Sequence, residues 1–191
     1  MRTILPAKHR LVPKHAKKVF TGNIFDVYQW EQELFDGSKA TFEMLKRPDT
    51  IQVLAVKDHK LVLLREEQPS MGPAYYSLPG GRHDVEAETE LDAAKRELRE
   101  ETGMIFSDWR LIEIEQPHTK IDWFIYYFLA SGYESQGDVH LDPGEKIEVL
   151  EADYDEILKL GRNEDLHHLP VRLLEQAKSI DGLTKLPQYG S

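Results

Sequence analysis

Alternating apolar and polar positions fill the first third of the chain, a pattern typical of β-strands. Residues 19–34 and 39–45 form two such runs on either side of an Asp36-Gly37 pair. Because an Asp-Gly pair between two runs of this kind favours a tight turn, an antiparallel hairpin is expected here. Residues 51–56 and 61–64 are more continuously apolar, so they predict a second hairpin in the buried centre of a sheet.

A helical period follows the Pro79-Gly80-Gly81 loop and extends over residues 88–102. Gly103 comes next, at the position where a C-cap glycine commonly ends a helix. Further strands are expected over residues 109–115, 121–131 and 146–151, and further helices over residues 154–160 and 170–180. The expected fold class is α+β, with a mixed sheet covered by a few helices and an antiparallel sheet at the N-terminus.

Size and composition narrow the possible classes of protein. The 191 residues, 40% of them hydrophobic, suit one compact domain with a small appendage. The longest uncharged apolar run, residues 123–130, is far shorter than the roughly 20 residues of a membrane-spanning helix. The chain has no cysteine, which excludes disulfides and thiolate metal sites and fits a reducing, cytoplasmic location. A net charge of −10 argues against a nucleic-acid partner.

Basic residues gather at the N-terminus before the first acid, Asp26: Arg2, Lys8, Arg10, Lys14, Lys17 and Lys18. Prolines and charges interrupt every stretch that could serve as the apolar part of a secretory signal. Two interpretations stay open for this segment. It is either a solvated leader or a counter-charge for the acidic surface of a partner.

The expected helix at residues 88–102 carries an unusual number of carboxylates. Residues 84–101 contain eight acids and three bases, and Glu97, Glu100 and Glu101 fall within one arc of the helix. Like charges at this spacing oppose helix formation, whereas a hard divalent cation would reverse the effect. Mg²⁺, with Mn²⁺ as an alternative, is the cation that such oxygen ligands favour. The competing interpretation is a solvated helix in which Arg96 bridges Glu100.

The surrounding residues strengthen the metal interpretation. Gly81, Glu88 and residues 96–104 together resemble the Nudix box, G-x5-E-x7-R-E-U-x-E-E-x-G-U, in which U is a bulky apolar residue. Residues 78–81, Leu-Pro-Gly-Gly, are similar to the usual entry to the box. The chain departs from the pattern once, because six residues rather than five separate Gly81 from Glu88. Either the loop holds one extra residue or Glu86 shares the role of Glu88.

The resemblance implies hydrolysis of a nucleoside diphosphate linked to another moiety. By the family pattern, Glu97 and Glu101 are the first metal ligands, Glu100 shares or bridges ions, and the Gly80 carbonyl completes a coordination sphere. Arg96 orients these carboxylates. A different class stays open as well, since some proteins of this fold bind a nucleotide as sensors without cleaving it.

The general base is expected outside the box. Residues 142–149 resemble the mobile loop that carries the catalytic glutamate in the branch cleaving ADP-ribose and nucleotide sugars, which makes Glu145 the candidate base. Glu148 is the reserve, although its alternation with Ile147 and Val149 also fits the exposed face of a strand. If water is activated within the box, Glu100 is the leading candidate.

Several stretches resemble the ADP-ribose pyrophosphatase branch, including the N-terminal strands, residues 43–47 and Glu67-Gln68. The expected reaction converts ADP-ribose to AMP and ribose 5-phosphate, and another nucleotide sugar such as GDP-mannose is the alternative. Pro69 departs from the branch, which commonly has an apolar residue and Arg after Glu-Gln.

The branch also predicts a homodimer, formed through residues 1–46, with a Nudix domain over residues 47–191. Trp30 is expected to stack on the nucleobase or, alternatively, to pack the dimer interface. Arg47 and Arg82 are expected to bind the phosphates.

Overall fold

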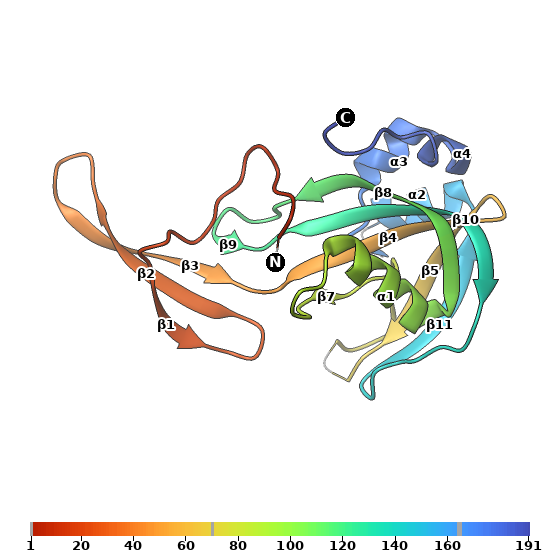
Figure 1. Cartoon of the computed structure of the whole chain (residues 1–191), viewed down its shortest axis with the longest axis horizontal. Coiled ribbons are helices and arrows are strands. Elements are labelled where there is room, and N and C mark those ends of the chain that lie inside the picture. Colours follow the sequence, from red (N-terminus) through yellow and green to blue (C-terminus); the bar gives the residue numbers. More distant parts are fainter. Residues whose placement is uncertain (1, 70, 164–165) are drawn as a thin grey trace.

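A computed structural model describes residues 2–69, 71–163 and 166–191, and Figure 1 shows an arm of strands projecting from a larger body. The arm is a four-stranded sheet in the order β1-β2-β3-β9. The body contains an eight-stranded mixed sheet with the path β12-β6-β5-β4-β10-β8, to which β7 and β11 add at β4 and β5. The expected α+β fold with an N-terminal antiparallel sheet is confirmed.

The arm consists of β1 (Lys17–Thr21), β2 (Asp26–Glu33) and β3 (Lys39–Lys46), with β9 (Ile121–Asp122) added in parallel to β3. The Asp36-Gly37 turn joins β2 and β3 as expected, and the Asp36 carboxylate accepts a hydrogen bond from the Ser38 amide at 3.0 Å. The run at residues 19–34 was expected to be continuous. It divides instead at a second turn, in which the Gly22 amide donates to the Phe25 carbonyl.

The second expected hairpin is formed by β4 (Asp49–Lys57) and β5 (Lys60–Glu67). The turn residues Asp58 and His59 both have positive φ, as a tight hairpin turn requires. The two strands pair only beside this turn, where Val56 is opposite Leu61 and Lys57 is opposite Lys60. Further along, β4 bonds instead to the Pro79-Gly80-Gly81 loop, through the amides of Ile51 and Val53. The glycine loop thus takes the place beside β4 that β5 leaves.

Helices cover both faces of the body sheet. Ile51, Val53 and Ala55 of β4 pack in one core with α1 (Glu90–Thr102), whereas Leu54 packs in a second core with α2 (Tyr154–Arg162), α3 (Val171–Ala177) and α4 (Ile180–Leu183). The period of two along a strand explains this division, because successive side chains point to opposite faces. The remaining strands of the body are β6 (Tyr75–Ser77), β7 (Arg82–His83), β8 (Met104–Glu115), β10 (Ile125–Gln136), β11 (Lys146–Ala152) and β12 (Leu166–His167).

Several predicted boundaries were wrong. The helix predicted from residue 88 begins at Glu90, because Thr89 caps it by accepting a hydrogen bond from the Asp92 amide. The helix predicted over residues 170–180 is two helices, since Lys178 adopts a left-handed conformation with φ 62°. The strand predicted over residues 121–131 is interrupted between β9 and β10. Strands β6, β7 and β12 were missed because two or three residues are too few to show a period. Within the described ranges, no helix has the length and apolar character needed to cross a membrane.

Most of the N-terminal segment is exposed, but Arg2 and Thr3 anchor its start to the body. The Arg2 guanidinium forms ion pairs with Asp49, at 2.5 Å, and with Asp122, and it lies 4.6 Å from the centre of the Phe124 ring. The amide and hydroxyl of Thr3 both donate to the buried Glu90 carboxylate. Part of the N-terminal positive charge therefore neutralises carboxylates of the chain's own body.

Replacing Arg2 with Met should destabilise the protein by about 3–5 kcal/mol, because two nearly buried carboxylates would lose their cation. The side chains of Asp49 and Asp122 are 5% and 3% exposed. The control is Lys39→Met, which breaks an exposed ion pair with Glu31 and should cost no more than about 1 kcal/mol. Urea denaturation measures both, and equal losses would contradict the prediction.

Candidate active site

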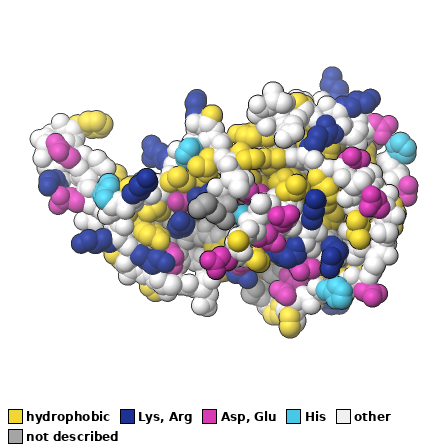
Figure 2. Space-filling model, in the orientation of Figure 1, with side chains coloured by type: hydrophobic (Ala, Val, Ile, Leu, Met, Phe, Trp, Pro, Cys, Tyr) yellow, Lys and Arg dark blue, Asp and Glu magenta, His cyan; other side chains and the backbone are white. Residues whose placement is uncertain are grey.

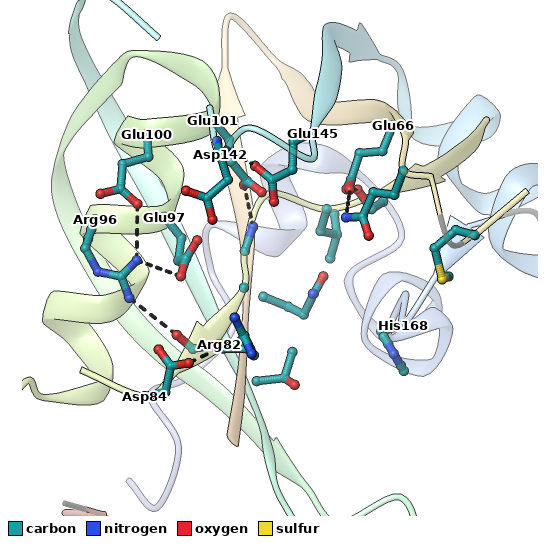
Figure 3. Close-up of a pocket in the computed structure, with 18 of the residues that line it drawn as sticks. Glu66, Arg82, Asp84, Arg96, Glu97, Glu100, Glu101, Asp142, Glu145 and His168 are labelled. Atoms are coloured by element: carbon teal, nitrogen blue, oxygen red, sulfur yellow. Dashed lines mark hydrogen bonds and ion pairs between the residues drawn. The ribbon is translucent and has the colours of Figure 1, made fainter. Parts of the chain in front are cut away.

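A cleft of about 770 Å³ lies where β4 and β5 separate. Most of the site residues predicted from the sequence line this cleft. Glu97, Glu100 and Glu101 reach it from α1, and Glu145 reaches it from the loop before β11 (Figure 3). Arg96, Gly80, Arg47 and Arg82 also line it. Segments distant in the sequence thus form one site.

Arg96 organises the carboxylates at the start of the box. Its guanidinium binds both oxygens of Glu88, at 2.8 and 3.0 Å, and also contacts Glu97 at 2.7 Å and Glu100 at 3.1 Å. The Glu88 side chain is 11% exposed, whereas Glu86 is exposed. Glu88 therefore occupies the loop position of the box. The extra residue is absorbed before it, where Ala87 adopts a left-handed φ of 63°.

The two glycines allow the loop to approach β4 and the helix closely. The Gly80 amide donates to Glu101 Oε2 at 2.8 Å. Gly80 has a φ of +151°, and a Cβ there would lie 2.1 Å from the Ile51 carbonyl oxygen. A Cβ on Gly81 would lie 2.5 Å from Glu97 Oε2. A side chain on Gly80 would therefore push the loop away from β4, and one on Gly81 would displace the Glu97 carboxylate.

Burial raises the pKa of two of these carboxylates, Glu97 and Glu101, and a bound cation would offset the cost of their buried negative charge. Burial is the main cause that raises the pKa of Glu101 well above its ordinary value, and the Glu97 charge adds to it. Burial also raises the pKa of Glu97 to about 7, although Arg96 acts in the opposite direction. An oxygen donor set with crowded negative charge fits Mg²⁺ or Mn²⁺.

The carboxylates of the described residues are not arranged as ligands around a common metal position. No group of three acidic or histidine side chains among them is gathered closely enough to hold an ion. Arg96 binds Glu97 and Glu100, and the Gly80 amide binds Glu101. The Arg96–Glu100 ion pair is the one that the competing interpretation of the sequence, a solvated helix without a metal, expected. Binding a cation here requires these side chains to exchange partners.

The metal-free protein should lose thermal stability as the pH rises from about 5 to 8. Folding raises the pKa of Glu97 from 4.5 to about 7. Between pH 4.5 and about pH 7 the folded state therefore binds more protons at Glu97 than the unfolded state does. Stability then falls as Glu97 ionises. Millimolar Mg²⁺ should oppose the fall, because it binds the ionised carboxylates of the folded state.

Calorimetric melting temperatures in EDTA and in Mg²⁺, at pH 5.5 and pH 8, measure both effects. Glu97→Gln is the control, and it should make the dependence on pH in EDTA weaker. A wild-type melting temperature that rises with pH in EDTA contradicts this assignment.

The loop that carries Glu145 is attached to the end of α1. The Gly137 amide donates to the Gly103 carbonyl and the His140 amide to the Glu100 carbonyl, both at 2.8 Å. Glu145 closes a turn with Asp142, and burial is the main cause that raises its pKa. Glu148, the reserve candidate, is exposed on β11, lies 3.6 Å from Arg65 and does not line the cleft.

The predicted substrate-binding residues lie in two places. Arg47 and Arg82 line the cleft, where Arg47 stacks over Trp123 at 4.6 Å and Arg82 lies 3.4 Å from Asp84. Burial and the neighbouring Arg82 charge lower the pKa of Arg47, a situation that an anion would relieve. Trp30 is on β2 of the arm, where its ring is 6.2 Å from that of Phe42, and it does not line the cleft of its own chain.

The residues of the cleft that were not recognised in the sequence include Gln52, Glu66, Tyr75 and Ser77. Gln52 offered a signal, because it is a polar residue within an otherwise apolar run. Glu66 resembled an ordinary polar residue at a strand end, although it is 7% exposed in the structure.

Comparisons with known proteins agree with the geometry. The NUDIX domain model matches residues 46–172, more than half of the chain. An ADP-ribose pyrophosphatase of Bacillus subtilis (strain 168) is 29% identical over 158 residues, which cover 79% of this chain and 83% of the relative. An ADP-ribose pyrophosphatase of Mycobacterium tuberculosis (strain ATCC 25618 / H37Rv) is 26% identical over 69% of this chain and 64% of its own length.

A solved structure of an ADP compounds hydrolase has the same fold, with a TM-score of 0.67, 17% identity and coverage of 94% of both chains. These matches, with all four glutamates of the box present, support an enzyme rather than a non-catalytic sensor. The chain belongs to the NUDIX family and is similar to its ADP-ribose pyrophosphatases.

Proposed function

We propose that the protein is a Mg²⁺-dependent pyrophosphatase, with Mn²⁺ as a possible substitute, that hydrolyses ADP-ribose to AMP and ribose 5-phosphate in the cytoplasm. The observation that carries the proposal is the meeting of Glu97, Glu100 and Glu101 with Glu145 in one cleft. The two curated relatives, both ADP-ribose pyrophosphatases, support the choice of substrate.

The residues of the cleft divide the chemistry between them. Glu97 and Glu101 would hold Mg²⁺, with Glu100 shared and the Gly80 carbonyl as a further ligand. The ion would neutralise phosphate charge and lower the pKa of water. Glu145 accepts a proton from the attacking water, one P–O bond of the pyrophosphate bridge breaks, and the bridging oxygen leaves with the other phosphate. Arg47 and Arg82 bind the phosphates through charge-assisted hydrogen bonds.

The arm is proposed to join two copies of the chain, so that Trp30 reaches the nucleobase in the partner's cleft. Several large apolar side chains of the arm are exposed, including Phe20 at 60% and Val19 at 52% (Figure 2 shows one face of the arm). A groove of about 650 Å³ along β3 and β9 is lined by Phe42, Met44, Leu45 and Ile121. Together these surfaces are suited to a protein interface.

Sedimentation equilibrium should therefore find a particle of two chains, each of 22.1 kDa. Phe20→Glu should shift the particle to a single chain, because it would place a charge in the interface. Lys39→Glu, an exposed change on the same arm, is the control and should leave the dimer intact. A wild-type protein that sediments as a monomer at all concentrations contradicts the proposal.

Incubation with a panel of nucleotide sugars and Mg²⁺, followed by chromatography of the products, tests the function. ADP-ribose should give AMP and ribose 5-phosphate with the highest kcat/KM of the panel. A higher kcat/KM for GDP-mannose would reassign the substrate. Nucleotide binding with no product from any member would favour a sensor.

A further inference from the structure

The side chain of Gln52 is a polar group among buried apolar residues of β4. Leu54 and Val56, at alternate positions on the same face of the strand, pack in the core covered by α2, α3 and α4. Gln52 is 7% exposed and lines the cleft. Its Oε1 has no hydrogen-bond partner within the part of the chain that the structure describes. A buried acceptor in this state weakens the folded protein, so its presence calls for an explanation.

Glu66, on β5, is a second buried acceptor of the same cleft. Its carboxylate accepts hydrogen bonds from the Tyr75 hydroxyl at 2.9 Å, from Gln68 Nε2 at 3.3 Å and from the Ser77 hydroxyl. A carboxylate offers about four acceptor positions, so these three donors leave room for another. In the described ranges, no basic side chain forms an ion pair with Glu66, in contrast to its neighbour Glu67.

Glu66 lies on the Glu145 side of the cleft, away from Arg82 and Arg96 (Figure 3). Arg47 and Arg82 are near enough for their charges to interact, so they form a basic end of the cleft. The cleft therefore offers positive donors for phosphates at one end, and at the other the Glu66 carboxylate, which has room for a further donor. Sugar hydroxyls are uncharged hydrogen-bond donors, so they are suited to the end of the cleft that holds Glu66.

We propose that Gln52 and Glu66 determine specificity by accepting hydrogen bonds from the hydroxyl groups of the sugar on the second phosphate. The proposal rests on the proposed function, since it concerns the same cleft and the same reaction. A further phosphate in this position would face the Glu66 carboxylate and be repelled. The two residues thus favour a diphosphate that ends in a polyhydroxylated sugar over one that ends in an alkyl group or another phosphate.

The test compares ADP-ribose with the methyl ester of ADP, which has the same diphosphate and no second sugar. Wild-type kcat/KM should be about 100-fold or more higher for ADP-ribose, because the ester leaves Gln52 Oε1 unpaired and the free acceptor position of Glu66 unused. Gln52→Met, which keeps the side-chain length without an acceptor, should reduce this preference about tenfold or more, and so should Glu66→Gln. Glu67→Gln is the matched control, and it should keep the wild-type preference because Glu67 pairs with Lys146 at the surface.

Melting temperature in the absence of substrate separates recognition from a structural role. Gln52→Met removes an unpaired buried acceptor, so its melting temperature should equal or exceed that of the wild type. A preference that survives in both variants overturns the proposal, and so does a marked fall in the melting temperature of Gln52→Met.

If the wild type cleaves neither compound nor any nucleotide sugar, the proposed function fails by itself. Calorimetric titration of both compounds in EDTA then tests the subsite. At least tenfold tighter binding of ADP-ribose by the wild type, lost in Gln52→Met, supports the proposal, and equal binding in both proteins overturns it.

Discussion

Glu101→Gln should remain folded and lose pyrophosphate cleavage by about three orders of magnitude or more. The lost cation–carboxylate contacts are worth several kcal/mol in the transition state, and each 1.4 kcal/mol is about tenfold in rate. Folding should survive because the Gln carbonyl can still accept the hydrogen bond from the Gly80 amide, which Glu101 accepts at 2.8 Å. Neutralising a carboxylate that is 6% exposed also removes a cost of burial.

Steady-state release of AMP from ADP-ribose in Mg²⁺ measures the loss, and a melting curve in EDTA verifies the fold. Glu86→Gln is the matched control, because Glu86 is an exposed carboxylate in the loop between Gly81 and Glu88 and forms no part of the Arg96 cluster, so this variant should retain wild-type activity. The stabilisation of wild type by millimolar Mg²⁺ should be smaller in Glu101→Gln. Activity within tenfold of wild type would remove Glu101 from the metal site.

The parts of the site that lie within one local stretch could be predicted from the sequence. Glu97, Glu100 and Glu101 were placed on one face of a helix by the 3.6-residue period, and the structure has all three in one cleft. Gly103 ends that helix as expected, with φ 71°. The fold class and family were also predictable, because the spacing of the box is a local signal.

Features that depend on distant contacts could not be predicted. Arg2 pairs with Asp49 and Asp122, which are 47 and 120 residues away, and no periodic pattern links such positions. Glu66 and Gln52 enter the cleft because β4 and β5 separate after their turn, a property of the sheet rather than of either strand. The proposed role of Trp30 depends on a second chain.

Glu145→Gln should lower kcat by about 10²- to 10⁴-fold and change KM little, since a general base acts on water rather than on substrate binding. Glu145 lines the cleft from a loop whose amides bind the C-terminal end of α1. Burial raises the pKa of its carboxylate, which brings the group closer to the value that suits a base near neutral pH. Mg²⁺ should still stabilise the variant, because the carboxylates of α1 are unchanged.

The pH dependence distinguishes a lost base from a disturbed site. Water bound to a cation ionises increasingly without help as the pH rises, so the deficit of Glu145→Gln should shrink between pH 7 and pH 9. Glu148→Gln is the control, since its exposed side chain near Arg65 lies outside the cleft, and it should stay close to wild type. If Glu145→Gln is fully active and Glu148→Gln is inactive, the base is Glu148. If both remain active, water is activated within the box, and Glu100, which contacts Arg96 at 3.1 Å, becomes the base.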